Sequence, residues 1–325
     1  MNKFDSSITW LRVCAMLMIV GCHIMIVSPY RFGTAAALLL NVGVEIFFMI
    51  SGYLYGQREI PGKYTQWYAK RFLRLAPPYY LFFAVLLGIH FCLGIHQGVK
   101  NWIVQLFCLQ GMEIYVSGAE HIWFMTVLLL CYLLTPLLDN LKRKYPLNIS
   151  VMVLLVSVVL QALTALFVNE QLGRYWLLVN FYMFSYLLGS QHVRCTKRKG
   201  CFLAAGMAGL AVAGRLIGKA LLDETVYYNI FISGITHCLL ALAFLFVFQH
   251  LFGKRKPNRL VRFLDSISYE VYLVHYMFIL GPISCMNLSK CFLLNVMVAF
   301  ILSIATAAVL HQMGETIGRK VLKGR

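Results

Sequence analysis

Residues 8–27 read ITWLRVCAMLMIVGCHIMIV, an apolar stretch long enough to cross a bilayer that carries two ionisable side chains, Arg12 and His23. At about 100° and 1.5 Å per residue, an α-helix brings these two residues to within about 20° of one face, about 16 Å apart. An ionisable residue inside a membrane helix is costly and by default suggests a functional site. The stretch therefore predicts a functional membrane helix; the alternative is that Arg12 reaches the interface and His23 only packs.

The apolar character continues along the whole chain. Of its 325 residues 60% are hydrophobic and 13% charged, and the mean hydropathy is +0.74, more apolar surface than a soluble domain of this size buries. We predict an all-α, polytopic membrane helix bundle of about ten transmembrane helices. The expected spans are residues 10–29, 36–56, 76–95, 119–138, 148–168, 174–191, 201–221, 229–250, 268–286 and 291–313. The apolar stretch 102–112 is too short to cross and is expected to lie at the interface or to re-enter.

The net charge is +17, and the basic residues behind it lie mainly in the loops between these spans. This distribution does not indicate nucleic acid as a partner. Lys and Arg gather in alternate loops and in the tail, at residues 58–74, 142–144, 194–199, 254–262 and 319–325. Loops rich in Lys and Arg stay in the cytoplasm. We therefore expect both termini to be cytoplasmic. We expect a multi-pass protein of the bacterial plasma membrane, embedded in the lipid bilayer.

The second expected span contains an acid. Residues 41–53 read NVGVEIFFMISGY, and Glu45 in the middle must pair, be protonated or face water. It lies roughly 13 Å into the span, a depth comparable to that of His23, so its carboxylate could orient the imidazole. The small residues of the stretch favour close helix packing: Gly43, Ser51 and Gly52. The alternative is a packing motif that contains a buried, protonated acid.

A cytoplasmic loop closes with a pair of arginines. Residues 71–78 read RFLRLAPP, and the spacing of three puts Arg71 and Arg74 on one side of a helix. Paired arginines suit phosphate recognition because each guanidinium offers a planar, bidentate fork. We expect Pro77 and Pro78 to break the helix where the third span begins. Anchoring of the loop on the cytoplasmic side would also explain the two arginines.

Five fragments in this order resemble the signature of the acyltransferase-3 family of integral-membrane, acyl-CoA-dependent acyltransferases. They are Arg12-x10-His23, the block from Gly43 to Tyr53, Arg71-x-x-Arg74-Leu75-x-Pro77, His121-Ile122-Trp123-Phe124, and the stretch from Ser268 that ends in Tyr272-Leu273-Val274-His275. The resemblance extends over nearly the whole chain, although residues 140–262 contain no matching motif. The acid of the second span is more often Asp in the family than Glu.

The resemblance implies O-acylation, usually O-acetylation, of a cell-envelope or extracellular glycan, with cytoplasmic acyl-CoA as donor and acetyl-CoA as the expected form. It implies that Arg12 and His23 are the catalytic pair and that Arg71 and Arg74 hold the donor. With Glu45 orienting it, His23 would act either as a general base or as a carrier of the acyl group. The expected substrate-binding residues are His121, Trp123, Ser268, Tyr272 and His275. Ser268, Tyr272 and His275 share one helix face and could equally be packing residues.

Many family members carry a C-terminal extracytoplasmic, esterase-like domain. This chain reaches Arg325 just after its tenth expected span, so we expect a single membrane domain over residues 1–325. Transfer would then be completed within that domain or with a separate extracytoplasmic transferase. The ten cysteines show no metal-ligand spacing and we expect no metal site, while Cys92 and Cys108 flank an outer loop and could pair.

Two other classes of protein fit part of the pattern. A transporter or flippase would also need intramembrane Arg, His and Glu and about ten spans, but would not depend on acyl-CoA. Such proteins often contain internal repeats, and this sequence contains none. A sensor or anchoring domain would keep the topology without needing the histidine.

Overall fold

The computed structural model describes residues 6–111, 114–194, 198–222 and 225–323, so the basic residues Lys197 and Arg325 lie outside it. The residues within these ranges form helices and connecting loops, with one isolated bridge between Gly111 and Ile114. This confirms the predicted all-α class. The chain forms two compact units, each assembled from three stretches. The first comprises Met1–Ala15, Val42–Ile60 and Val127–Arg262, and the second Met16–Asn41, Pro61–Thr126 and Phe263–Arg325.

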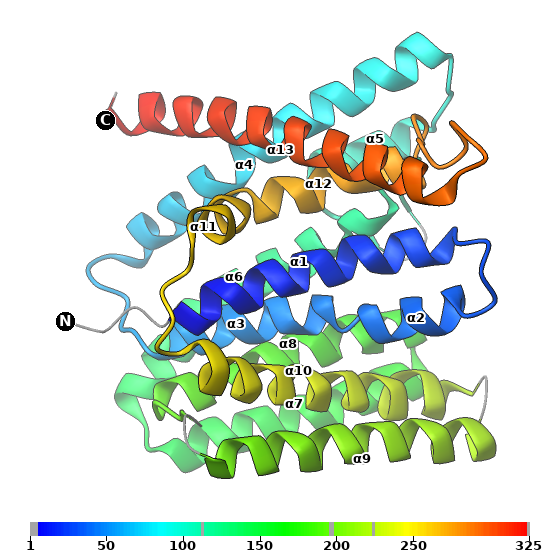
Figure 1. Ribbon diagram of the computed structural model, residues 1–325. Helices are drawn as coiled ribbons and strands as arrows, with labels where there is room; N and C mark the ends of the chain where they lie inside the picture. The colour runs from blue at the N-terminus through cyan, green and yellow to red at the C-terminus, as the bar shows by residue number, and fades with distance from the viewer. Residues whose placement is uncertain (1–5, 112–113, 195–197, 223–224, 324–325) are drawn as a thin grey trace. The chain divides into compact units, whose positions relative to one another are not determined.

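The first unit is built on helices that pack lengthwise. It contains α3 (Gly43–Gly56), α7 (Leu147–Phe167), α8 (Glu170–Ser190), α9 (Arg198–Leu222), the π-helical η2 (Tyr227–Ile232) and α10 (Ser233–Phe252). The beginning of α1 (Ser6–Ile26) and most of α6 (Trp123–Lys144) also belong to it. α8 packs against α3 and α7, and α10 packs against α3 and α9 (Figure 1). The interior of this unit therefore lies between α3, α8 and α10.

Glycines bring α3 and α8 into backbone contact. A Cβ atom added to Gly52 would collide with the carbonyl oxygen of Tyr182, and one added to Gly56 with that of Tyr186. On the facing helix, Gly189 leaves equally little room against the backbone of α3. In lipid, helices associate through close packing because burial of apolar surface gains little there. The close packing expected of Gly52 is confirmed.

The second unit surrounds a short, buried helix. It contains α2 (Gly33–Leu40), α4 (Tyr64–Leu93), α5 (Val99–Leu106), the 3₁₀ turn η1 (Glu120–Ile122), α12 (Ser268–Ile279) and α13 (Phe292–Lys323). The end of α1 and the start of α6 belong to it, and α11 (Arg259–Ser266) is divided between the units. α12 packs against α4 and α13, which also contact each other (Figure 1). Nearly every side chain of α12 is buried, so its residues are held in place from all sides.

The prolines of the arginine stretch do not end a helix, and this expectation was wrong. α4 continues through Pro77 and Pro78, although each proline removes one helical hydrogen bond. Neighbouring helices support the irregular turn, as happens in membrane helices. The hydroxyl of Tyr269 donates to the carbonyl oxygen of Leu75 at 3.1 Å, and Gly314 of α13 leaves room for the ring of Pro78.

Among the described residues, eight helical segments are long and apolar enough to cross a membrane, which fits a multi-pass membrane protein. They are Ser6–Ile26, Gly33–Gly56, Tyr64–Leu93, Glu120–Lys144, Leu147–Phe167, Gly200–Leu222, Tyr227–Phe252 and Phe292–Lys320. Each matches one expected span. The other two expected spans correspond to α8 and α12. α8 carries several polar residues along its length, and α12, with 12 residues, is about 18 Å long. The count of ten is therefore not confirmed.

Candidate active site

Three histidines from distant parts of the sequence meet in the second unit. His23 comes from α1, His121 from η1 and His275 from α12. The ring centroid of His275 lies 5.0 Å from that of His23 and 5.0 Å from that of His121, and the centroids of His23 and His121 are 6.2 Å apart. The sequence assigned these residues to separate motifs, and the structure brings them together. We call His23, His121 and His275 the histidine cluster.

The hydrogen bonds of His275 determine how protons are arranged in this cluster. Its Nδ1 lies 3.0 Å from the carbonyl oxygen of Val271 and 2.8 Å from that of Tyr272. Because a carbonyl only accepts, Nδ1 of His275 carries the hydrogen, and in the neutral ring Nε2 is an acceptor. Nδ1 of His23 lies 2.8 Å from this Nε2 and must donate to it. The remaining nitrogen of neutral His23, Nε2, therefore has a lone pair that can take up a proton or attack a carbonyl.

His121 is fixed by a reciprocal pair of contacts with Tyr272. Its Nε2 donates to the carbonyl oxygen of Tyr272 at 2.8 Å, and the hydroxyl of Tyr272 donates to the carbonyl oxygen of His121. Nδ1 of neutral His121 therefore carries a lone pair. This atom is buried and has no hydrogen-bond partner among the residues that the structure describes. It can accept a hydrogen bond from a bound molecule.

Tyr276, which no motif singled out, closes the cluster on one side. Its ring stacks on His121 with centroids 4.8 Å apart, and its edge meets His23 at 5.0 Å. The signal was present, because Tyr276 lies four residues after Tyr272 and thus on the same face of a helix. In the described part of the chain, no group of three or more His, Cys, Asp or Glu side chains is arranged to hold a metal ion.

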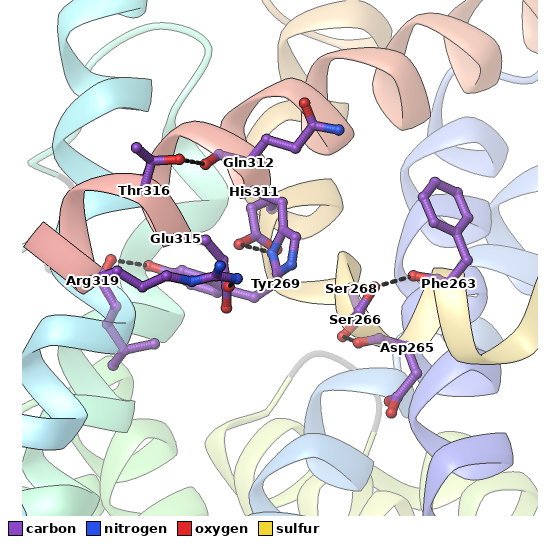
Figure 2. Close-up of polar contacts among 12 residues, drawn as sticks. Phe263, Asp265, Ser266, Ser268, Tyr269, His311, Gln312, Glu315, Thr316 and Arg319 are labelled. Carbon is purple, nitrogen blue, oxygen red and sulfur yellow. Dashed lines mark hydrogen bonds and ion pairs between the residues drawn. The ribbon is translucent and has the colours of Figure 1, made fainter.

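Two expected substrate-binding residues lie at the margins of this arrangement. Trp123 is half-buried in the first turn of α6, and its neighbour Phe124 contacts the ring of Tyr272 at 4.9 Å. Ser268 is buried at the start of α12, where its hydroxyl donates to the carbonyl oxygen of Asp265 at 3.0 Å (Figure 2). Ser268 lies seven positions before His275, about 10 Å along the helix. Ser268 thus stabilises a helix start in this structure.

The arginine pair on α4 has two different environments. The guanidinium of Arg71 lies over the ring of Trp67, 5.4 Å from its centroid. Arg74 is exposed and within electrostatic reach of Glu270 and Glu315.

Both acids near Arg74 also have a second partner, and Figure 2 labels His311, Glu315 and Arg319, which take part in these contacts. Glu270 is 4% exposed, and its carboxylate accepts a hydrogen bond from Nδ1 of His311 at 2.9 Å. Glu315 forms an ion pair with Arg319, one turn later in the same helix. The positive charge of Arg74 is therefore partly balanced by acids of the chain itself, whereas Arg71 lies against an aromatic ring.

Glu45 and Arg12 belong to the first unit. One carboxylate oxygen of Glu45 lies 3.3 Å from Nδ1 of His237 on α10, a residue that no motif singled out. Arg12 is half-buried on α1, the helix that also carries His23. The structure thus gives Glu45 a histidine partner within its own unit.

One comparison with known proteins identifies a family. The sequence model of the acyltransferase-3 family, described as an acyltransferase domain, matches residues 5–311. No curated protein and no solved structure matches the chain. The match covers nearly the whole chain, including all five fragments that resemble the family signature. The chain therefore belongs to the acyltransferase-3 family and is an acyltransferase embedded in a membrane.

Proposed function

We propose that the protein transfers an acyl group, with acetyl as the expected group, from cytoplasmic acyl-CoA to a hydroxyl of a cell-envelope or extracellular glycan, with Nε2 of His23 as the reacting nitrogen. The observation that carries this proposal is the chain of hydrogen bonds from the backbone of α12 through His275 to His23. This chain leaves the lone pair on Nε2 of His23. The family membership supports the acyl transfer.

In the direct form of the reaction, His23 acts as a general base. Nε2 takes the proton from the acceptor hydroxyl while the hydroxyl oxygen attacks the thioester carbonyl. The C–S bond then breaks, and the proton on His23 passes to the departing CoA sulfur. The products are an acyl ester and CoA thiol, so no proton is gained or lost overall.

In the covalent form, Nε2 itself attacks the thioester and an acyl-imidazole forms as CoA leaves. CoA leaves as the thiolate; the acceptor hydroxyl then attacks the acyl group, its C–N bond to His23 breaks, and the hydroxyl proton passes to the thiolate, which restores the neutral ring and gives CoA thiol. Both forms need the same lone pair on Nε2 of His23. In both, we assign His275 the task of holding the imidazole in the reactive tautomer, a task the sequence analysis gave to Glu45.

Of the remaining expected residues, the arginines and His121 keep their expected roles, whereas Tyr272 and Ser268 take structural ones. Arg71 and Arg74 bind the phosphates of the donor, and Arg12 takes part as the first member of the Arg-x10-His motif. His121 accepts a hydrogen bond from the acceptor through its buried Nδ1. Tyr272 orients His121, and Trp123 borders the same region.

The test adds acetyl-CoA, labelled in the acetyl group, to membranes that contain the protein and follows the label. We expect the label in an envelope glycan with the wild type and its loss, by about 10²–10⁴-fold, with His23→Ala. His90→Ala is the matched control, since His90 is 2% exposed in the same unit and its Nδ1 hydrogen-bonds to the carbonyl oxygen of Leu86 in its own helix at 2.9 Å. Near-normal transfer by His23→Ala would overturn the proposal.

A further inference from the structure

A second group of ionisable side chains lies inside the first unit, away from every motif of the family signature except Glu45. Glu45 stands near the start of α3, His237 near the start of α10 and Arg215 in the later part of α9. α10 packs against both of the other helices. On the topology expected from the basic loops, these helix ends point toward the extracytoplasmic side. We call Glu45, His237 and Arg215 the Glu45 group.

Each member is held by a specific contact. Oε1 of Glu45 lies 3.3 Å from Nδ1 of His237. Nε of Arg215 donates to the hydroxyl oxygen of Thr236 at 3.0 Å, and that hydroxyl in turn donates to the carbonyl oxygen of Ser233 at 2.9 Å. Arg215 is also within electrostatic reach of Glu45. The Glu45 group is therefore positioned by backbone and side-chain contacts that do not use all of its polar atoms.

Two of the unused atoms are buried. Oε2 of Glu45 and Nη2 of Arg215 are shielded from solvent and have no hydrogen-bond partner among the described residues. Glu45 is 8% exposed, so its carboxylate has almost no access to bulk water. A buried polar atom without a partner is costly, most of all when the group is charged. The first unit thus presents one unmatched acceptor and one unmatched donor on charged residues that interact with each other.

The backbone beside this group is irregular. η2, the π-helical turn that precedes α10, places Tyr228 within electrostatic reach of Arg215, and the rings and side chains of η2 lie against Gly218 of α9. π-Helical turns cost stability and occur often at functional sites. A helix that only crosses the membrane would not need one at this position.

We propose that the Glu45 group binds a neutral, hydroxyl-bearing ligand of the sugar or polyol class. A hydroxyl group both donates and accepts, so a pair of neighbouring hydroxyls can donate to Oε2 of Glu45 and accept from Nη2 of Arg215. An anion would leave the carboxylate unmatched and a cation would leave the guanidinium unmatched. This inference rests on the proposed function in one respect: it takes the glycan acceptor of the acyl transfer as the ligand of the Glu45 group.

The experiment measures binding of radiolabelled methyl α-D-glucopyranoside to the purified full-length protein in lipid nanodiscs, without acyl-CoA. Wild-type protein should bind this neutral glycoside, and Arg215→Met should weaken binding at least about tenfold, the loss expected for a charge-assisted hydrogen bond. Glu45→Gln, which changes the size of the side chain very little, should weaken binding similarly because an amide nitrogen can replace the acceptor Oε2. Arg174→Met is the matched control, since Arg174 is an exposed arginine of the same unit outside the group.

Several outcomes would overturn the inference. One is that the wild type does not bind the glycoside; another is that Arg215→Met and Glu45→Gln bind it as the wild type does, which would mean that ordered water alone satisfies the buried atoms. Binding that is equally strong for the glucuronide anion would also contradict it. If Arg215→Met does not fold, Glu45→Gln decides.

The same preparations separate this inference from the proposed function. His23→Ala should keep glycoside binding while losing acyl transfer. Transfer by the wild type without any effect of Arg215→Met or Glu45→Gln on binding would remove the inference and leave the proposed function standing. If the wild type binds the glycoside in a way that depends on Arg215 but shows no acyl transfer, the inference stands and the proposed function is removed.

Discussion

Nδ1 of His23 lies 2.8 Å from Nε2 of His275, and the carbonyl oxygens of Val271 and Tyr272 hold the opposite nitrogen of His275. The backbone of α12 therefore sets the proton arrangement of His23 through a second imidazole, that of His275. α12 is buried along nearly its whole length, which keeps these carbonyls in place. This relationship makes the role of His275 separable from that of His23 by mutation.

His275→Phe should lower kcat for acyl transfer by about 10²-fold, because His23 loses the side-chain acceptor that helps to select its tautomer and general-base catalysis contributes about 10²–10⁴-fold. KM for acyl-CoA should stay nearly unchanged, since His275 is not assigned to the donor. His275→Gln should recover part of the loss because its amide oxygen can accept from Nδ1 of His23. Steady-state kinetics of purified variants measure both parameters. An equal loss in the Gln and Phe variants would indicate that His275 acts by packing alone.

Arg71→Lys should weaken binding of acyl-CoA by about 10–150-fold, which corresponds to the loss of about 1.5–3 kcal/mol from a charge-assisted, bidentate contact. Lysine keeps the positive charge that sets topology but has no planar fork and cannot stack on Trp67 in the same way. Lys70→Arg, at an exposed position on the same helix, is the control. Isothermal titration with CoA gives the affinities. Wild-type affinity in Arg71→Lys would favour a purely anchoring role.

Arg74→Ala should weaken CoA binding and also lower thermal stability, unlike Arg71→Lys. Without Arg74, the buried Glu270 loses one of the two positive or hydrogen-donating partners identified for it and keeps His311. Removing one partner of a buried charge is more costly than removing an exposed one. The midpoint of thermal unfolding measures this difference, and the double variant Arg74→Ala with Glu270→Gln should regain stability but not affinity. Unchanged unfolding in Arg74→Ala would show that the acids do not depend on it.

Gly56→Ala should destabilise the first unit by about 1–3 kcal/mol, the usual cost of overpacking, because the added Cβ atom meets the backbone of α8. Gly206→Ala is the control, since nothing lies within 4 Å of the Cβ position at Gly206, which is also in a helix of this unit. Unfolding in mild denaturing detergent compares the two. Equal stability of both variants would mean that α3 and α8 can separate at low cost.

Reporters fused after Arg325 and within residues 142–144 should behave as cytoplasmic, and reporters near Asp223 or Asn287 as external. Asp223 and Arg325 lie outside the described residues, so these fusions test the expected topology independently of the helix bounds. An external reporter after Arg325 would show that one expected span does not cross, and α12 is then the first one to examine because of its length.

The sequence predicted the helical class and the positions of eight spans because hydropathy over about 20 residues reports directly on membrane insertion. It failed at Pro77 and Pro78, where the helix persists because of contacts with α12 and α13 that local rules do not include. The same limit applies to the candidate site. His23 and His275 could be named singly from motifs, but a hydrogen bond between residues 252 positions apart depends on tertiary packing.

His237 and Arg215 show the limit most clearly. Both lie in the part of the chain where no fragment resembles the family signature, and a lone histidine or arginine in an apolar helix has no spacing rule that predicts its partner. Glu45 was recognised as an acid that needs a partner, and a histidine was the right kind of residue. Which histidine it contacts is decided by the packing of α3 against α10.

α4 and α13 contain 30 and 32 residues, which corresponds to lengths of about 45 and 48 Å. The hydrocarbon core of a bilayer is about 30 Å thick, so each helix is about one and a half times as long as the core is thick. Charged residues lie in the first part of α4 and near the end of α13, where Gly318 lies next to the backbone of Leu73, so we expect the two ends to extend together beyond the lipid. Such a surplus cannot be absorbed by tilting, as an apolar mismatch would be. On the expected topology, the arginines of α4 would lie on a pair of helices whose length in the aqueous phase does not depend on membrane thickness, and the proposed binding of acyl-CoA should then be equally strong in thin and thick bilayers.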